Sequence, residues 1–305
     1  MGFGQKRQEE QGFRALRRTV LFRPIEALWS AVFAVVGSAA HPARRVGRWS
    51  PARGRVLVVA PHPDDETLGC GGTIALHGRA GDEVVVLIVT DGGASRAATH
   101  SQRADESAGA AVTIGGTWHR LALPEGAWRF PEGREQIRRV LAKYRPDLLY
   151  APSGIDYHPE HVRVARALAA ALGEAGLEPR VRVYEVGVPL TPLLANHLVE
   201  LGAAADLKAR ALAAYASQQG AIRPIRRLHR YNRRLYGAGG EVEIFWEMPA
   251  PSYARLLAAG EQRVGRFPFR GIRERPFGDL LPFLVGLNER SRLRAACAPL
   301  DDTAT

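Results

Sequence analysis

Residues 55–61 read RVLVVAP, a continuous apolar run of strand length that stops at a histidine, a second proline and three carboxylates. A strand that is apolar at every position is typical of a parallel sheet whose two faces are both covered. Similar patterns predict further strands, each with its following turn, within 82–95, 117–126, 148–154 and 180–189. Segments with helix-compatible spacing lie between them at 67–81, 103–116, 134–147 and 161–176.

Strands that alternate with helices at this spacing imply right-handed crossovers within one sheet. We therefore expect the α/β fold class, with a Rossmann-like, mostly parallel sheet between helical layers. Ligands bind such sheets outside the carboxyl ends of the strands. Three polar segments should meet at that edge, and we place the active site there: the turn at 62–66, the turn at Asp91 and the loop at 153–161.

The second half of the chain has weaker periodicity. Residues 207–219 read as a helix and 241–249 as an edge strand, with a strongly basic segment between them at 222–237. We divide the chain into three parts. They are an N-terminal extension at 1–50, a central domain at 51–250 and a C-terminal extension at 251–305.

The N-terminal extension is basic and aromatic at 13–24 and apolar at 25–40 apart from Glu26 and a few small polar residues. This apolar stretch is shorter than the about 20 residues that a spanning helix needs. Two structures fit it best, a basic helix lying in a membrane interface and a helix docked on the protein's own core. A cleaved signal fits less well, because the basic region is long and an acid lies inside the apolar run. We expect a cytoplasmic protein, with peripheral contact at the inner membrane face through 13–40 as the open alternative.

The composition is strongly basic, since 42 Lys and Arg residues against 31 Asp and Glu residues give a formal net charge of +11. Arginine predominates, and its guanidinium suits phosphate and carboxylate groups, so an anionic substrate, a lipid surface or nucleic acid would all fit. A solvated arginine-rich surface is the simpler explanation. Cys70 and Cys297 lie far apart and neither belongs to a CxxC pair, so any metal site should use nitrogen and oxygen ligands.

The turn after the first strand carries residues suited to a metal site. A catalytic zinc site has three His, Asp or Glu ligands and one open position. His62 and Asp65 are three residues apart, and Pro63 stiffens the bend between them. HPEH at 158–161 offers a third ligand from another loop, with one histidine on the metal and the other facing the substrate. Asp64 would then lie beside the reacting centre.

A structural explanation accounts for part of this pattern. A helix N-cap, with acids favoured by the helix dipole, would explain one or two of the three carboxylates. A lone HxxH is also a weak signal. Neither explains all three acids together with His62.

Taken together, the motifs resemble those of the PIG-L/LmbE-like family of zinc-dependent N-acetylglucosaminyl deacetylases. The resemblance covers about 54–219 and extends to a late strand. It rests on PHPDDETLGCGG at 61–72, TDG at 90–92, Arg103-x-x-Glu106, DYHPEH at 156–161, SQ at 217–218 and EIFW near 242–246. The chain departs from the family at Gly93, Ala94 and Ser95, where members often carry an acidic or larger polar residue. One substrate contact is therefore expected to be missing or supplied elsewhere.

The resemblance implies a Zn²⁺ site, with other divalent transition metals as alternatives, held by His62, Asp65 and His161. It also implies that Asp64 is the general base, that His158 stabilises the oxyanion as an imidazolium, and that Arg103 helps to hold the substrate. We include Asp91 among the substrate-binding candidates, with a turn cap as its equal alternative.

The leading hypothesis is therefore a zinc-dependent hydrolase that removes an N-acetyl or longer acyl group from a glucosamine-containing conjugate. The rest of the conjugate is left open, and the basic segments favour an anionic or lipid-linked one. One alternative is a metal-dependent phosphoesterase, although two-metal sites usually need more ligands than we count. Another is a vestigial metal site in a protein that binds an anionic surface or nucleic acid through 222–237. Nucleic acid is not the partner we expect.

Overall fold

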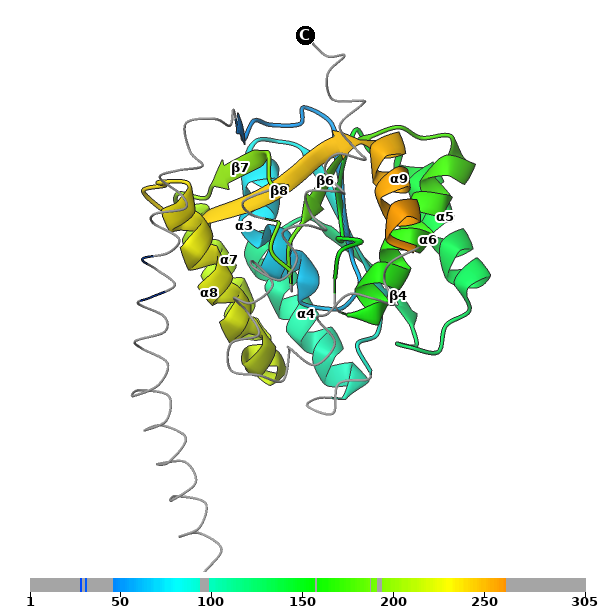
Figure 1. Cartoon of the computed structure of the whole chain (residues 1–305). Coiled ribbons are helices and arrows are strands. Elements are labelled where there is room, and N and C mark those ends of the chain that lie inside the picture. Colours follow the sequence, from blue (N-terminus) through cyan, green and yellow to red (C-terminus); the bar gives the residue numbers. More distant parts are fainter. Residues whose placement is uncertain are drawn as a thin grey trace, which may run out of the picture.

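The structure is a computed structural model that describes residues 46–93, 99–156, 158–186, 188–190 and 194–261, together with Leu28 and Ala31. Within these ranges eight strands form one sheet, flanked by helices (Figure 1). The strands are β1 (Gly47–Arg48), β2 (Arg55–Ala60), β3 (Glu83–Thr90), β4 (Thr117–Leu123), β5 (Leu148–Ala151), β6 (Arg180–Tyr184), β7 (His197–Glu200) and β8 (Val242–Pro249). The helices are α3 (Asp65–Arg79), α4 (His100–Ile114), α5 (Phe130–Tyr144), α6 (Pro159–Ala175), α7 (Ala204–Ala214), the 3-10 helix η3 (Ala216–Gln218), α8 (Gln219–Leu235) and α9 (Ala250–Glu261).

The sheet is mostly parallel, as the sequence predicts. Its order is β1-β7-β8-β6-β5-β2-β3-β4, and β8 alone among the described strands runs antiparallel to its neighbours. The five strands expected from the apolar runs correspond to β2 to β6. The expectation that 241–249 forms an edge strand is wrong, because β8 lies between β6 and β7. The four residues of β7 are too few to show a period, so this outer neighbour of β8 was not predicted.

Each central strand is buried on both faces because alternate side chains enter two different cores. Leu57 and Val59 of β2 belong to the core under α5, α6 and α9, whereas Val56, Val58 and Ala60 belong to the core under α3, α4 and α7. This two-sided burial explains why the strand is apolar at every position.

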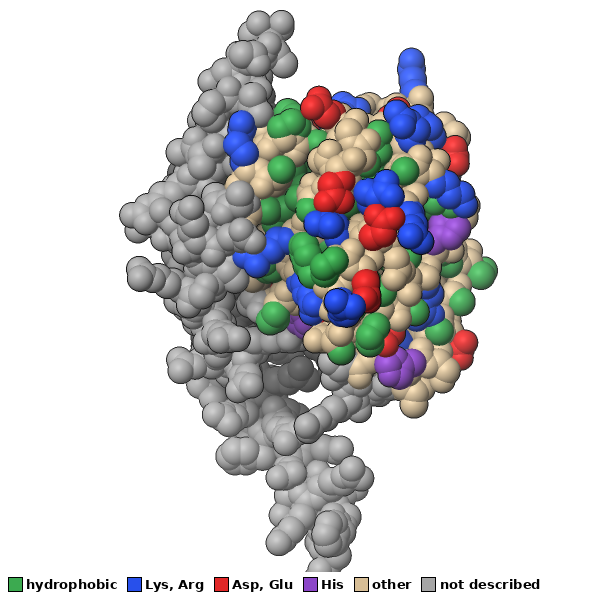
Figure 2. All heavy atoms as spheres, turned by 90° about the vertical axis from the view of Figure 1, so that its right-hand side faces the viewer, with side chains coloured by type: hydrophobic (Ala, Val, Ile, Leu, Met, Phe, Trp, Pro, Cys, Tyr) green, Lys and Arg blue, Asp and Glu red, His purple; other side chains and the backbone are tan. Residues whose placement is uncertain are grey.

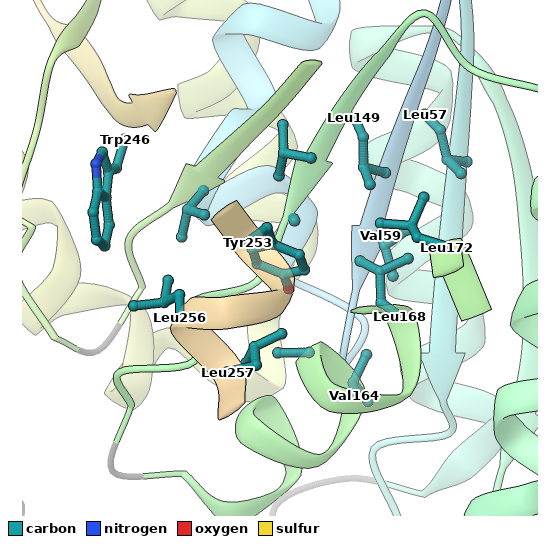
Figure 3. Close-up of a cluster of buried hydrophobic side chains, with 14 of the residues drawn as sticks. Leu57, Val59, Leu149, Val164, Leu168, Leu172, Trp246, Tyr253, Leu256 and Leu257 are labelled. Atoms are coloured by element: carbon teal, nitrogen blue, oxygen red, sulfur yellow. The ribbon is translucent and has the colours of Figure 1, made fainter. Parts of the chain in front are cut away.

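Helix α9 lies where the sequence predicts a C-terminal extension without clear periodicity. Its Tyr253, Leu256 and Leu257 turn toward α6 and the sheet (Figure 3). The Tyr253 hydroxyl also donates to the carbonyl of Pro152 at 2.9 Å. The packed core therefore continues past residue 250 to include α9, while 262–305 lie outside the described residues.

The basic segment at 222–237 forms most of α8, an amphipathic helix with no acidic residue. Its buried and exposed sides differ sharply. Ile222, Leu228, Tyr231 and Leu235 are buried, and the exposed described arginines are Arg226, Arg230, Arg233 and Arg234. Among the described residues, no helix is both long and apolar enough to cross a membrane.

The surface around α5 has a different character. Basic and acidic side chains are interspersed on the face shown in Figure 2. At the start of α5, the N-cap residue Arg129 pairs with Glu132, and within the helix Arg138 pairs with Glu135. Positive charge on this side is therefore largely compensated, unlike that on α8.

The strand order has a topological switch point at β2. From β2 the chain proceeds outward through β3 to β4, and it then returns to the other side of β2 as β5. The connections that follow β2 and β5 therefore leave the sheet in opposite directions, and ligands bind open α/β sheets at such a switch point. The turn at 62–66 follows β2, and the loop at 153–161 follows β5.

Candidate metal centre and active site

The acidic turn after β2 does not act as a side-chain helix cap. Asp64 precedes α3 and its carboxylate makes no capping hydrogen bond. The Asp65 carboxylate instead turns back, so that its Oδ2 accepts the backbone N–H of His62 at 2.9 Å and lies 3.1 Å from His62 Nδ1. The purely structural explanation of this acidic cluster therefore loses its main support.

The loop after β5 carries its two histidines at the start of α6. His158 is the N-cap of α6, and its Nδ1 accepts the backbone N–H of Glu160 at 3.3 Å. His161 lies in the first turn of α6 and points its Nε2 at the acidic turn. The other ring nitrogen, Nδ1, lies 2.8 Å from Asp156 Oδ2.

Three donor atoms meet at nearly equal distances between these two segments. His62 Nδ1 lies 3.1 Å from Asp65 Oδ2 and 3.2 Å from His161 Nε2, which itself lies 3.2 Å from the same Asp65 oxygen. Donors bound at about 2.0–2.1 Å to a tetrahedral zinc are about 3.3–3.4 Å apart, so this triangle has the size of one face of such a site. The residues present therefore fit the metal that the resemblance implies.

A second set of three donors shares two of these residues. The ring nitrogens of His62, His158 and His161 all lie within 4.8 Å of one another. The set that contains Asp65 is tighter and closer to zinc geometry, so it is the better candidate. His158 is then not one of the three ligands. Its ring packs edge-on against that of His62, with centroids 4.7 Å apart.

Two carboxylates that the sequence analysis did not single out contact the histidines from outside. Asp156 faces His161 Nδ1, and Glu125 Oε1 lies 3.0 Å from His62 Nε2 and 3.9 Å from His158 Nε2. Carboxylates in such positions fix the orientation of metal-binding imidazoles. Both follow strand ends, Asp156 after β5 and Glu125 after β4, and that position was the signal available in the sequence.

Electrostatic coupling within the triangle is strong. Burial disfavours the imidazolium form of His62, but hydrogen bonds to Asp65 and Glu125 outweigh it and raise the pKa of His62 to about 9. Burial opposes ionisation of Asp65 as well, yet His161 and His62 hold its pKa well below the ordinary value. This carboxylate is thus ionised and available as a ligand.

Asp64 is buried next to Asp65 in the chain, and it has cationic neighbours in Arg103 and His62. Its Oδ1 lies 3.5 Å from Arg103 Nη2. Burial and the negative charge of Asp65 raise the pKa of Asp64 to about 8, against the opposing effect of Arg103. A divalent cation on the neighbouring donors would lower this pKa, because an opposite charge within a few ångströms favours the carboxylate.

His158 differs from the expectation of an imidazolium. Burial, together with the charges of His161 and His62, lowers the pKa of His158 to about 4. The neutral ring is therefore the favoured form near pH 7. A neutral imidazole can still donate one N–H, but its tautomer then matters.

Arg103 and Asp91, the two substrate-binding candidates, are both held by the protein's own groups. The Arg103 guanidinium donates to the carbonyl of Pro63 at 2.5 Å, next to Asp64. Asp91 Oδ1 accepts the N–H groups of Gly93 and Glu125 at 2.9 and 3.1 Å. Asp91 therefore makes the turn-capping bonds that were its alternative role, and it also ties the Glu125 loop to the end of β3. Ala94 and Ser95, where the chain departs from the family, lie outside the described residues.

A buried glutamate between the two histidines supports the Glu125 loop. Glu160 Oε2 accepts the N–H of Gly126 at 2.8 Å, and its other oxygen accepts the indole N–H of Trp128. The loop after β4 is thus fastened to the first turn of α6. All candidate residues therefore belong to one connected structure at the carboxyl edge of the sheet.

Comparison with known proteins finds a family model and relatives that match the part of the chain that carries this site. A family model described as "PIG-L: GlcNAc-PI de-N-acetylase" matches residues 57–172, a range that holds every candidate residue named above. A 1D-myo-inositol 2-acetamido-2-deoxy-alpha-D-glucopyranoside deacetylase of Kineococcus radiotolerans is 30% identical over 204 residues, which are 49% of this chain and 56% of that protein. A diacetylchitobiose deacetylase of Thermococcus kodakarensis is 30% identical over 190 residues, or 54% and 70% of the two chains.

The fold has a match among solved structures as well. A conserved protein of Thermus thermophilus superposes with a TM-score of 0.55 at 31% sequence identity, covering 62% of this chain and 92% of that one. The inositol-glycoside deacetylases, in contrast, are matched over only about half to three fifths of their length, from 51% to 58% for the first four.

Proposed function

This chain belongs to the PIG-L family, and from that premise we propose that it is a metal-dependent hydrolase that removes the N-acetyl group of a glucosamine-containing conjugate. The observation that carries the proposal is the triangle of His62 Nδ1, Asp65 Oδ2 and His161 Nε2, with edges of 3.1–3.2 Å. The Asp64 carboxylate lies buried beside it, as a general base for hydrolysis would.

His62, Asp65 and His161 would hold the metal, and Zn²⁺ is the ion that their donor set and spacing favour. Such an ion, when bound, supplies a Lewis acid that polarises the amide carbonyl and activates water near neutral pH. The chain's own carboxylate manages the protons. Asp64 takes a proton from the attacking water and returns it to the amine nitrogen as the C–N bond breaks, so a free amine leaves together with acetic acid, which then ionises to acetate.

His158 and Arg103 support this reaction in different ways. The His158 ring packs against the rings of His62 and His161, where a donated N–H would stabilise the oxyanion that forms on the carbonyl oxygen. One such donor is typically worth a few kcal/mol. Arg103 lies beside Asp64 at 3.5 Å and opposes the rise in its pKa, which keeps more of the base ionised.

The substrate is proposed as a small glucosamine conjugate. Relatives are named for an inositol glycoside of N-acetylglucosamine and for diacetylchitobiose, and we infer a substrate of that general class. The exposed arginines of α8 favour a conjugate that carries an anionic group. Residues 13–40, through which the sequence suggests membrane contact, lie outside the described residues apart from Leu28 and Ala31, so that contact stays a prediction.

The deciding experiment measures amine release from a panel of substrates. The panel contains N-acetylglucosaminyl inositol, its phosphorylated form, diacetylchitobiose and free N-acetylglucosamine. Wild type is compared with Asp64→Asn, and both proteins are loaded with Zn²⁺ and assayed for bound metal. We expect the variant to retain its metal and to lose at least 10²-fold in kcat, because general-base catalysis contributes about 10²–10⁴-fold.

Each contrary outcome has a definite meaning. Activity that is equal in wild type and variant would remove Asp64 as the base. No activity on any conjugate would contradict the proposed substrate class. In that case, phosphoesterase activity on the same metal-loaded protein and salt-dependent binding to anionic vesicles or nucleic acid would be measured next.

A further inference from the structure

The backbone of Asp64 has a conformation that side-chain-bearing residues avoid. Its φ is 131° and its ψ is −29°. A residue other than glycine persists in such a conformation only when its surroundings hold it there, and such residues cluster at functional sites. The groups that hold Asp64 in this conformation therefore also fix the direction of its carboxylate.

Three bonds surround this residue. Its carbonyl accepts the N–H of Leu68 at 2.8 Å, as the first turn of α3 requires. The carbonyl of Pro63, which belongs to the same peptide unit as the Asp64 amide, accepts from Arg103. The Asp64 N–H donates to Oε2 of Glu66 at 3.1 Å. The last bond comes from a side chain that the proposed chemistry does not use.

Glu66 is itself held from a distant part of the chain. Its second oxygen, Oε1, accepts the hydroxyl of Tyr215 at 2.5 Å and that of Thr67 at 2.6 Å. Glu66 and Tyr215 are both fully buried. Tyr215 lies between α7 and η3, about 150 residues after the acidic turn. The tyrosine therefore fixes the glutamate, and the glutamate fixes the amide of Asp64.

We propose that Glu66 and Tyr215 are positioning residues that hold the backbone of Asp64 at positive φ and so aim its carboxylate at the reacting centre. This inference rests on the proposed function, in which Asp64 is the base. Without the Glu66 carboxylate, the buried Asp64 N–H would lose this hydrogen bond. Rotation of the Asp64 backbone toward negative φ would then become favourable. That rotation, with compensating changes in the neighbouring backbone torsions that keep Asp65 and the two histidines together, would turn the carboxylate away from the reacting centre.

The test compares variants that differ in the acceptor they offer. Glu66→Gln keeps an oxygen for the Asp64 N–H and an amide group for Tyr215, so it should keep activity within about tenfold of wild type. Glu66→Met removes the acceptor and should lose at least 100-fold in kcat with KM and bound Zn²⁺ unchanged. Tyr215→Phe, which removes one oxygen, should lose about tenfold in kcat in the same way.

Ser217→Ala is the matched control for these variants. Ser217 lies two residues after Tyr215, and its hydroxyl binds another buried carboxylate, that of Glu106, at 2.7 Å. A purely structural role for Tyr215 predicts that both substitutions lower Tm and leave kcat unchanged. The positioning role predicts a fall in kcat for Tyr215→Phe alone.

Crystal structures of zinc-loaded wild type, Glu66→Gln, Glu66→Met and Tyr215→Phe give a readout that needs no substrate. We expect φ of Asp64 to stay positive in wild type and Glu66→Gln and to become negative in Glu66→Met. If Glu66→Met does not fold, Tyr215→Phe decides through its kcat and its Asp64 geometry. Positive φ with unchanged kcat in the folded variants would overturn the inference. If wild type is inactive on every conjugate, the proposed function fails. The positioning role is tested separately in that case, because an unchanged φ of Asp64 in Glu66→Met would overturn it without any activity measurement.

Discussion

At the scale of single residues, the site gathers charges that would be costly to bury apart. Asp64, Asp65, His62 and His161 are all less than 10% exposed. The distances among Asp65, His62 and His161 fit both a hydrogen-bonded cluster and a metal site. The positions of the outer carboxylates Asp156 and Glu125 favour the metal site over a merely hydrogen-bonded cluster. A carboxylate on the far nitrogen of each imidazole is the arrangement that makes histidine a better and better-oriented ligand.

Replacing Asp156 by Asn tests this arrangement. Asp156 contacts the backbone N–H of His158 through Oδ1 and His161 Nδ1 through Oδ2. The variant keeps only one of these oxygens and loses the negative charge, so affinity for Zn²⁺ should fall by about 10-fold or more. Competition with a chromophoric chelator measures the affinity directly. Asp105→Asn, an exposed change on α4, serves as the control and should leave affinity unchanged. Equal affinity in all three proteins would remove Asp156 from the metal site.

At the scale of elements, the position of α3 depends on glycines that let the helix approach the sheet. A Cβ at Gly69 would overlap the ring of Tyr184 on β6, and one at Gly72 would come within 2.6 Å of two Leu201 methyl carbons. Gly78, in the last turn of the same helix, has open space where its Cβ would be. The glycine-rich stretch after the acidic turn is therefore a packing surface that presses the first turn of α3, with Asp65, onto the strand ends.

Gly69→Ala and Gly78→Ala should consequently have opposite effects. Gly69→Ala should lower the free energy of unfolding by about 1–3 kcal/mol, since overpacking forces backbone or ring shifts. Gly78→Ala should raise it by about 0.5–1 kcal/mol, because alanine costs less backbone entropy in a helix. Urea unfolding of both variants measures the difference. Loss of stability of the same size in both would show that helix packing at Gly69 is not the cause.

The elements also show what the sequence could predict and what it could not. The parallel strands were predictable because burial on both faces leaves an uninterrupted apolar run, and the acidic turn and HPEH loop were predictable because they follow such strands. The short β7 was not, and α9 was obscured by the Pro- and Arg-rich context of its apolar positions Tyr253, Leu256 and Leu257. Glu125 escaped notice because its role depends on the neighbour that it meets across the sheet edge.

At the scale of the whole molecule, the residues at the carboxyl ends of the strands differ in role from those at the amino ends. The carboxyl edge carries the candidate site with its backbone strain and strongly shifted pKa values. At the amino edge, Asp82 accepts the N–H groups of Ala52 and Gly54 at 3.0 and 3.2 Å and lies 2.6 Å from His77 Nδ1. His77 continues to the Tyr150 hydroxyl at 2.9 Å. This edge joins the loop before β2, the end of α3 and β5 without touching the site.

Asp82→Asn should therefore lower stability and leave zinc affinity unchanged. Burial opposes its ionisation, but the bonds from His77 and the two amides outweigh burial and lower the pKa of Asp82. A carboxylate with a depressed pKa stabilises the fold above its unfolded pKa of about 3.9, and this contribution is lost as pH falls further through the folded pKa. We expect a loss of about 1–3 kcal/mol at pH 7 that shrinks below pH 4.

Urea unfolding at a series of pH values measures this difference. Glu132→Gln, in an exposed pair with Arg129, should change stability by less than about 1 kcal/mol at any pH. A stability difference for Asp82→Asn that does not depend on pH would contradict the assigned role.

The position of β8 has a consequence for the order in which the molecule can be completed during synthesis. All the candidate metal ligands lie within residues 62–161, yet β8 supplies Glu243, which accepts the N–H groups of Gly72 and Thr73 in α3 at 2.9 Å each and pairs with buried Lys208. Until β8 leaves the ribosome, β6 and β7 each lack the strand with which they pair. A nascent chain can therefore hold every candidate metal ligand while α3, which carries Asp65, still lacks its bonds to Glu243. Metal capture should then follow the emergence of β8, not the synthesis of the ligands.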